Sequence, residues 1–196
     1  MTIIVGITGL IASGKTTLCS YLKKLNYKIF EADNSARELY NDEDFLLIIK
    51  KDFPEVFIDG KIDKKLLAKI IFNDVNKKKQ LENIIHPIVN GHCDNFISKN
   101  RNEKILFIES ALLFEADWYK KCNKIILLTI DRGIEKQRYT EREGSDKLFD
   151  IILKNQVDVK NKIEKCDYII ENNSDIFHLY KETDKVLYKL NNSTKI

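Results

Sequence analysis

Residues 9–16, Gly-Leu-Ile-Ala-Ser-Gly-Lys-Thr, carry their glycines, lysine and threonine at the spacing G-x-x-x-x-G-K-[ST]. The β-branched run Ile3–Ile7 precedes this segment, as a buried strand requires. After it, apolar residues recur at the spacing of one helix face, at Leu18, Tyr21, Leu22 and Leu25. In a strand, loop and helix of this order, backbone N–H groups and the helix N-terminus bind phosphate. The segment therefore predicts a nucleoside triphosphate site, with a glycine-bearing turn and a surface lysine as the alternative.

The same pattern predicts what the loop residues do. Lys15 is expected to reach the β- and γ-phosphates of ATP, and the Thr16 hydroxyl is expected to bind Mg²⁺. The residues expected to surround the phosphates are Ala12, Ser13, Gly14, Lys15, Thr16 and Thr17.

Composition restricts the partners that the chain can have. Its 196 residues suffice for one domain, or for a core with small insertions. Charged residues make up 32% of the chain but nearly balance, and a net charge of +3 with scattered lysines argues against nucleic acid as a partner. No apolar run is long enough to span a bilayer, and the apolar N-terminus lacks the basic residues of a signal peptide.

Four cysteines lie without C-x-x-C spacing, which favours reduced thiols in a reducing compartment. We therefore expect a cytoplasmic protein that is not associated with a membrane. A monomer or a weak homo-oligomer is expected.

Five short apolar runs alternate with helical patterns, which predicts a parallel sheet with helices on both faces. The fourth run is nearly all apolar, as a strand covered on both sides should be. The predicted fold is an α/β P-loop NTPase with a five-stranded parallel sheet. Its strands are expected at Ile3–Ile7, Tyr27–Phe30, Ile105–Ile108, Lys124–Ile130 and Tyr168–Ile170.

The interval between the second and third runs is longer than a crossover needs, and it predicts an inserted helical subdomain. Pro87 lies inside the last helical pattern and should kink or restart that helix. Near the end of the chain, Ser174 stands at an expected N-cap, and an apolar stripe runs from Ile176 to Leu190. The helices expected in the insertion are Ala32–Tyr40, Asp44–Lys51, Asp63–Phe72 and Val75–Lys99.

Asp33 directly follows the second expected strand, in Glu31-Ala32-Asp33. Ligands of open parallel sheets bind beyond the carboxyl ends of the strands. A kinase needs a carboxylate there to orient the acceptor hydroxyl and take its proton. We assign that role to Asp33 and place Glu31 near the magnesium. An N-cap for a helix beginning at Ala36 is an equally weighted alternative for Asp33.

Arg138 and Arg142 are four residues apart and so share a helix face. Guanidinium groups suit the charge of a phosphoryl group in transfer. A turn at Gly144-Ser145-Asp146 then predicts a small helix–turn–helix flap that can close over the phosphates. The alternative, which spacing alone favours, is an exposed helix whose arginines pair with Glu135, Glu141 or Glu143.

The remaining polar candidates are weaker. Glu109 ends the third expected strand, where an acidic residue can face the metal region, and Glu115 follows it. Either could instead be a solvated helix charge, which is the slightly favoured interpretation of Glu115. The three histidines lack metal-ligand spacing, so no zinc site is predicted. Trp118 is expected in the core or against the flap.

Several segments together resemble the dephospho-CoA kinase family over nearly the whole chain. The family's opening T-G-G-I-G-S-G-K-[ST] corresponds to residues 8–16, and its D-A-D corresponds to Glu31-Ala32-Asp33. Its L-x-x-I-x-H-P corresponds to 81–87, and its P-L-L-F-E to 111–115. Its Q-x-x-R-x-x-x-R is matched at the two flap arginines, and its A-D-x-[IV]-I-x-N at 166–172, after a downstream glutamine matched by Gln156.

This resemblance implies that ATP phosphorylates the ribose 3′-hydroxyl of dephospho-CoA, the last step of coenzyme A synthesis. It implies a nucleotide-binding core (1–33, 100–136 and 157–196), a helical CoA-substrate-binding insertion (34–99) and a lid (137–156). Under it Asp33 is the general base, Lys15 and Arg142 stabilise the transferred charge, and Arg138 binds the nucleotide. The acceptor would contact Asp33, Arg37, His86, Pro87, Leu113 and Glu115.

Two of the departures from the family pattern fall in the loop. Leu10 and Ala12 replace two glycines, and either would carry strain if its backbone needed a positive φ. Ala111 replaces a proline, and Cys166 and Ser174 stand where alanine and glycine are usual. None of these changes removes a reacting group, so activity is expected.

The nearest alternative function is a nucleoside or nucleoside-monophosphate kinase. A GTP-dependent switch is disfavoured because the chain has no N-K-x-D motif.

Overall fold

The computed structural model describes residues 2–143 and 163–192. The chain divides into two compact units, residues 1–30 with 100–196, and residues 31–99. The expected helical insertion at 34–99 lies within the second unit. Most of the expected lid at 137–156, including its turn at Gly144-Ser145-Asp146, lies outside the described residues.

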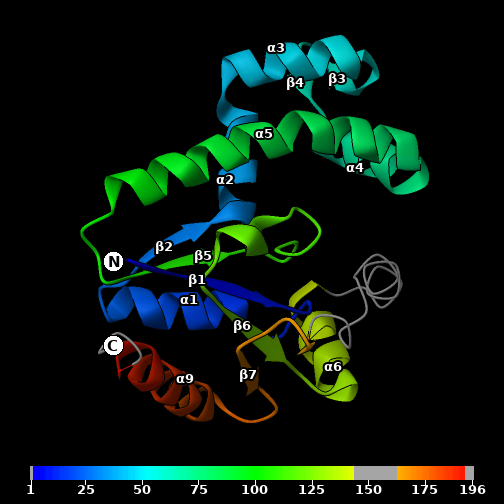
Figure 1. The fold of residues 1–196 in the computed structure, drawn as a ribbon. Helices are drawn as coiled ribbons and strands as arrows, with labels where there is room; N and C mark the ends of the chain where they lie inside the picture. The colour runs from blue at the N-terminus through cyan, green and yellow to red at the C-terminus, as the bar shows by residue number, and fades with distance from the viewer. Residues whose placement is uncertain (1, 144–162, 193–196) are drawn as a thin grey trace. The chain divides into compact units, whose positions relative to one another are not determined.

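A five-stranded sheet forms the centre of the first unit, in the order β2-β5-β1-β6-β7 (Figure 1). β1 pairs in parallel with both β5 and β6, and β6 pairs in parallel with β7. The five expected strands are all present, each within two residues of its expected ends. Their bounds are β1 Ile3–Gly9, β2 Lys28–Glu31, β5 Ile105–Glu109, β6 Lys124–Thr129 and β7 Tyr168–Glu171.

Two helices, α1 (Lys15–Lys24) and α9 (Ile176–Asn192), cover one face of this sheet (Figure 1). Every second residue of the strands points to this face and packs against α1 and α9 in one buried cluster, because side chains alternate between the two faces of a sheet. The two helices also contact each other, where Tyr21 stacks on Tyr180 with ring centroids 4.0 Å apart. The cluster contains Val5, Ile7, Leu18, Cys19, Leu22, Ile105, Phe107, Ile126, Leu128, Ile170, Leu179, Val186, Leu187 and Leu190.

The other strand residues face a second buried layer. Leu113 packs beside Gly6 of β1, and Trp118 begins the short 3₁₀ helix η3 (Trp118–Lys121). The Trp118 ring lies edge-on to Phe30, 6.1 Å between centroids, so it is a core residue. The helix that follows β6 is α6 (Arg132–Glu143).

Two expectations about helix ends are wrong. Leu25 lies past the end of α1 and is 42% exposed. At α9 the side chain of Asp175, not Ser174, accepts the His178 N–H at 2.9 Å. Both serine and aspartate can cap a helix, and α9 begins at Ile176, one residue after the aspartate.

The second unit is helical except for one hairpin, and its last helix runs unbroken through Pro87. The expectation that Pro87 restarts the helix is therefore wrong. Proline removes one helical hydrogen bond, but α5 packs against both α2 and α4, which stabilises it on either side. The elements are α2 Ala32–Glu38, η1 Leu39–Asn41, α3 Glu43–Asp52, η2 Pro54–Val56, β3 Phe57–Ile58, β4 Lys61–Ile62, α4 Lys64–Asn73 and α5 Val75–Lys99.

The β3–β4 hairpin was not expected from the sequence. Its turn is Asp59-Gly60, and both residues have positive φ, 49° and 77°. Asp-Gly is the pair that a two-residue hairpin turn favours. The signal was present, but strands of two residues leave no alternating pattern to accompany it.

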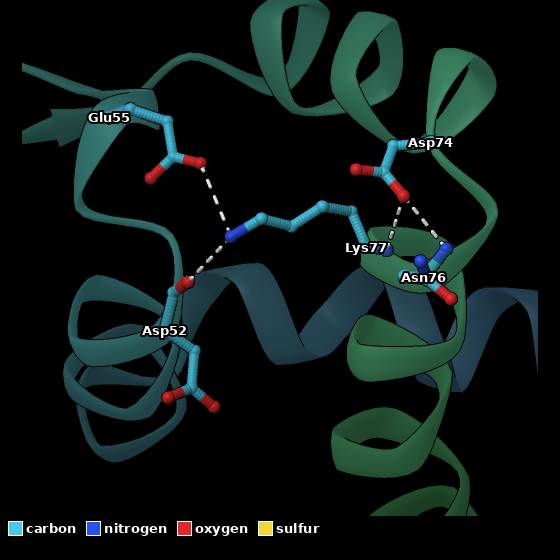
Figure 2. Close-up of polar contacts among 5 residues, drawn as sticks. All are labelled: Asp52, Glu55, Asp74, Asn76 and Lys77. Atoms are coloured by element: carbon cyan, nitrogen blue, oxygen red, sulfur yellow. Dashed lines mark hydrogen bonds and ion pairs between the residues drawn. The ribbon is translucent and has the colours of Figure 1, made fainter.

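Figure 2 shows how the start of α5 is fixed within the second unit. Asp74 accepts the backbone N–H groups of Asn76 and Lys77 at 2.8 and 3.1 Å, which satisfies two free donors of the first turn. The Lys77 ammonium reaches back to the Asp52 carbonyl at 3.5 Å and to the Glu55 carboxylate at 3.6 Å. These contacts connect α5 to the end of α3.

Among the described residues, no helix is long and apolar enough to cross a membrane.

Candidate active site

The loop between β1 and α1 is held by close backbone approach at its two glycines. A Cβ on Gly9 would lie 2.5 Å from the Leu128 carbonyl oxygen, and one on Gly14 would lie 2.4 Å from Nδ2 of Asn172. Gly14 also has φ +99°, in the left-handed region. Both pattern glycines therefore stand where a side chain would displace the loop.

The two departures from the family glycines differ in consequence. Ala12 has φ +55° and so occupies the left-handed region, which costs a residue with a Cβ roughly 1 kcal/mol or more. Leu10 is not among the positive-φ residues of the described chain. The strain expected at one of these positions therefore falls on Ala12.

Asn172, the residue after β7, fastens the loop to the sheet. Its amide Nδ2 donates to the Ser13 carbonyl at 2.8 Å, and its backbone N–H donates to the Thr129 carbonyl at 2.9 Å. The side chain is only 5% exposed, so this bond is shielded from water. The Ser13–Gly14 peptide is thereby kept against the carboxyl end of the sheet.

Arg138 binds the same turn from α6. Its guanidinium donates to the carbonyl oxygens of Asn172 and Ser174, at 3.0 and 2.9 Å. The interpretation of Arg138 as an exposed arginine paired with neighbouring glutamates is therefore wrong.

These residues surround a cavity of about 300 Å³ within the first unit. The phosphate loop and start of α1 form one side, and the β7–α9 turn with Arg138 forms the other. N–H groups at the start of α1 and two cations give this cavity a positive potential suited to phosphate. Its lining is Ala12, Ser13, Gly14, Lys15, Thr16, Thr17, Arg138, Asn172, Ser174, Asp175, Ile176 and Leu179.

Lys15 bonds within the loop in this structure. Its ammonium donates to the carbonyl oxygens of Gly9 and Leu10, at 3.0 and 3.2 Å. Buried polar atoms nearby lack hydrogen-bond partners among the described residues: Thr8 Oγ1, Ser13 Oγ and Glu135 Oε1. Because an unpaired buried polar group is costly, such a cluster fits a polar ligand or a loop that rearranges around one.

Glu135 is the buried carboxyl of this region, with 1% of its surface exposed. Burial raises its pKa to about 7, although the positive charges of Arg132 and Lys15 oppose the rise. The expectation that Glu135 is a solvated partner of the flap arginines is wrong, because it lies on the buried face of α6.

Asp33 and Glu31 lie at the start of the second unit. α2 begins at Ala32, so Asp33 is in the first turn and Glu31 is the N-cap, without a side-chain cap bond. The proposed N-cap role of Asp33 for a helix beginning at Ala36 is therefore wrong. Both carboxylates are half-buried, and a carboxylate in a first turn is stabilised by the helix dipole.

The other expected acceptor residues are placed as follows. His86 and Pro87 lie in the middle of α5, half-buried and exposed respectively, and Arg37 is exposed near the end of α2. Glu115 is exposed, whereas Leu113 is fully buried beside Gly6. A direct contact of Leu113 with substrate would require its segment to move.

Arg142 belongs to α6, and its side chain is outside the described part of the chain. Glu109, at the end of β5, is 7% exposed. No group of three or more potential metal ligands occurs within residues 2–143 and 163–192.

Two residues of this site were missed from the sequence. Asn172 belongs to a family motif, but its contact with the loop joins positions 159 residues apart. Glu135 was weighed only as a salt-bridge partner. The sequence did indicate its burial, because Glu135 lies three residues before Arg138 and on the same face of α6 as the buried Tyr139.

Comparison with known proteins agrees with the motifs. A family model described as dephospho-CoA kinase matches residues 3–178. The dephospho-CoA kinase of Bartonella quintana (strain Toulouse) is 32% identical over 190 residues, which cover 95% of this chain and 97% of that protein.

Solved structures give the same result. A dephospho-CoA kinase from Campylobacter jejuni superposes with a TM-score of 0.72 and 27% identity, covering 97% of this chain and 98% of that one. The protein TT1252 from Thermus thermophilus superposes with a TM-score of 0.85 and 28% identity, covering 96% and 98%. The resemblance stated from the sequence is confirmed: the chain belongs to the dephospho-CoA kinase family and is a kinase that uses ATP.

Proposed function

We propose that this chain transfers the γ-phosphoryl group of ATP to the ribose 3′-hydroxyl of dephospho-CoA, giving coenzyme A and ADP. The observation that carries the proposal is the cavity beside the phosphate loop, in a chain that matches the family over nearly its whole length. The cavity suits the triphosphate of ATP in its volume, in the close backbone approach at its glycines, and in the positive charges of Lys15 and Arg138.

In this proposal the phosphates rest on the backbone from Ala12 to Thr17. Lys15 leaves the carbonyl oxygens of Gly9 and Leu10 and binds the β- and γ-phosphates. Arg138 has its guanidinium at the cavity wall and contributes positive charge to the nucleotide. Arg142 is assigned to the phosphoryl group in transfer, where its charge stabilises the equatorial oxygens.

A hydroxyl and a carboxylate are oxygen ligands of the kind that Mg²⁺ binds. Thr16 lies in the first turn of α1 with an exposed side chain, and Glu31 is assigned as the second protein group near the ion. Mg²⁺ needs few protein ligands when phosphate oxygens and water complete its octahedron. The ion would neutralise charge on the β- and γ-phosphates.

Asp33 is assigned as the general base. Its carboxylate would accept the proton of the 3′-hydroxyl as O3′ bonds to the γ-phosphorus and the bond from phosphorus to the β,γ-bridging oxygen breaks, releasing ADP. Residues 34–99, with Arg37, His86 and Pro87, are assigned to the acceptor, and residues 137–156 to a lid. We also propose a cytoplasmic protein that is a monomer or a weak homo-oligomer.

A coupled assay that offers dephospho-CoA, CMP, AMP and uridine tests the substrate. We expect ATP-dependent transfer to dephospho-CoA above all others. Preference for another acceptor would replace this proposal with a nucleoside or nucleoside-monophosphate kinase. GTP binding tighter than ATP binding, without transfer to any acceptor, would instead favour a switch protein.

The general base is tested by Asp33→Asn. The variant should bind ATP with wild-type affinity and turn over about 100-fold more slowly, which is the scale of losing a base. An unchanged kcat would limit Asp33 to a structural role in α2.

A further inference from the structure

Glu135 is a buried acid of the nucleotide-binding unit that takes no part in the proposed transfer. Its side chain is 1% exposed, and its Oε1 atom has no hydrogen-bond partner among the described residues. A buried carboxylate normally has hydrogen bonds or a close cation, because burying an unpaired charge costs several kcal/mol. An unpaired oxygen here indicates that the carboxyl group is suited to hold a proton.

The surroundings of Glu135 connect it to the phosphate loop. Among the described residues, the charged groups that act on it are Lys15, from the start of α1, and Arg132, from its own helix. Both attract the ionised form, and burial opposes it. The Lys15 ammonium therefore both donates to the two loop carbonyls and attracts the Glu135 carboxylate.

Nucleotide binding shifts the balance between the ionised and protonated forms of Glu135 toward the protonated form. If Lys15 turns to the β- and γ-phosphates, its charge is neutralised by the ligand, and a polyanion arrives near Glu135. Both changes disfavour an ionised carboxylate in a buried site. The protonated acid is then favoured, because a neutral carboxyl group costs less to bury without a partner than a carboxylate does.

We propose that Glu135 is a positioning residue of the phosphate loop, a buried acid that takes up one proton as the triphosphate draws Lys15 away. Nucleotide affinity is thereby linked to pH. This inference rests on the proposed binding of ATP at the loop, and it concerns the charge state of the loop rather than the reaction.

The direction of the pH dependence follows from the linkage between proton binding and nucleotide binding. Binding that favours the protonated acid is strongest where the free protein already holds the proton, and it weakens as the pH rises past the pKa of about 7. One proton changes the Kd by up to about tenfold per pH unit between the free and bound pKa values. The dependence should therefore lie above pH 7.

Isothermal titration calorimetry of MgATP at pH 7.5, in buffers of different ionisation enthalpy, counts the protons directly. The wild-type chain should take up as much as about three-quarters of a proton, because about one-quarter of the acid is already protonated at this pH, and it should lose affinity from pH 7 to pH 8. Glu135→Gln should take up almost none and should keep its affinity across this range. Glutamine is also the residue of the family's Q-x-x-R-x-x-x-R motif at this position, which favours normal folding of the variant.

Glu141→Gln is the matched control, because it removes an exposed acid from the same helix. It should behave as wild type, which also accounts for protonation of the nucleotide itself. Proton uptake near zero in the wild-type chain, or equal uptake in Glu135→Gln, would overturn the inference. If the wild-type chain bound no ATP, the proposed nucleotide site would fail as well, so the two failures are distinguishable.

Discussion

Gly14→Ala tests whether the phosphate loop is fixed by its contact with the turn after β7. The added Cβ would lie 2.4 Å from Nδ2 of Asn172, well inside van der Waals contact. That nitrogen cannot withdraw without releasing the Ser13 carbonyl, which it holds at 2.8 Å. The substitution therefore changes the backbone, the packing and one buried hydrogen bond together.

The expected loss of stability is the sum of two terms. Alanine at φ +99° costs roughly 1 to 2 kcal/mol, because a Cβ in the left-handed region crowds the following carbonyl. Loss of the Asn172–Ser13 bond leaves buried polar groups unsatisfied and costs roughly 1 to 3 kcal/mol. A total of about 2 to 5 kcal/mol should lower the melting temperature by about 5 to 15 °C for a chain of this length.

Urea unfolding followed by circular dichroism measures this loss. Gly91→Ala is the control, since Gly91 lies within α5, where an added Cβ would meet nothing within 4 Å, and the variant should gain up to about 1 kcal/mol. A double-mutant cycle with Asn172→Ala should show strong coupling, because removing the amide removes the clash. Wild-type stability of Gly14→Ala, or additive losses in the cycle, would refute the reasoning.

Three further substitutions test other contacts. Arg138→Lys should raise the Kd for ATP about five- to tenfold, since lysine lacks the planar pair of nitrogens that reach the Asn172 and Ser174 carbonyls separately; titration of MgATP measures it, and an unchanged Kd would contradict it. Asp74→Ala should cost about 1 kcal/mol of unfolding free energy by removing the cap of α5, whereas Asp74→Asn should cost little. The pKa of Glu135 is higher in the folded chain, about 7, than in the unfolded chain, about 4.5. At pH values between these two the folded chain binds more protons, so its free energy of unfolding falls as the pH rises through this range. Glu135→Gln should therefore match wild type near pH 4.5 and exceed it by about 2 to 3 kcal/mol above pH 7 in urea unfolding, and equal stability at pH 8 would count against a buried ionised acid.

The strands could be predicted because each is encoded locally. Lys124–Thr129 is apolar along nearly its whole length and lies inside the sheet, between β1 and β7. The helix Val75–Lys99 was also predicted with its observed ends, and Asp74, which caps its first turn, is a local feature that fixes where it begins. Pro87 did not end that helix, because packing of α5 on its neighbours outweighs a single lost bond.

The part of the site that could be predicted is the part made by one continuous sequence motif. The loop glycines, Lys15 and Thr16 follow from one pattern, because the backbone conformation that binds phosphate needs them at that spacing. Asn172 could not be placed on the loop in this way, since its bond to Ser13 depends on the pairing of β6 with β7. Glu135 was misassigned because the spacing of charged residues along α6 does not show which of them is buried.

In the first unit, hydrogen bonds join the phosphate loop to the turn between β7 and α9. Asn172 binds the loop carbonyl of Ser13, and Arg138 binds the carbonyl of Asn172 itself, so α6 is connected to the loop through a single residue. Movement of α6 must therefore either carry the turn with it or break the partly buried hydrogen bond from Arg138 to the Asn172 carbonyl. Because Lys15 and Glu135 interact at the same junction, the charge on a bound triphosphate acts on α6 from the loop side. This arrangement gives nucleotide binding a direct physical route to the helix that leads into residues 144–162.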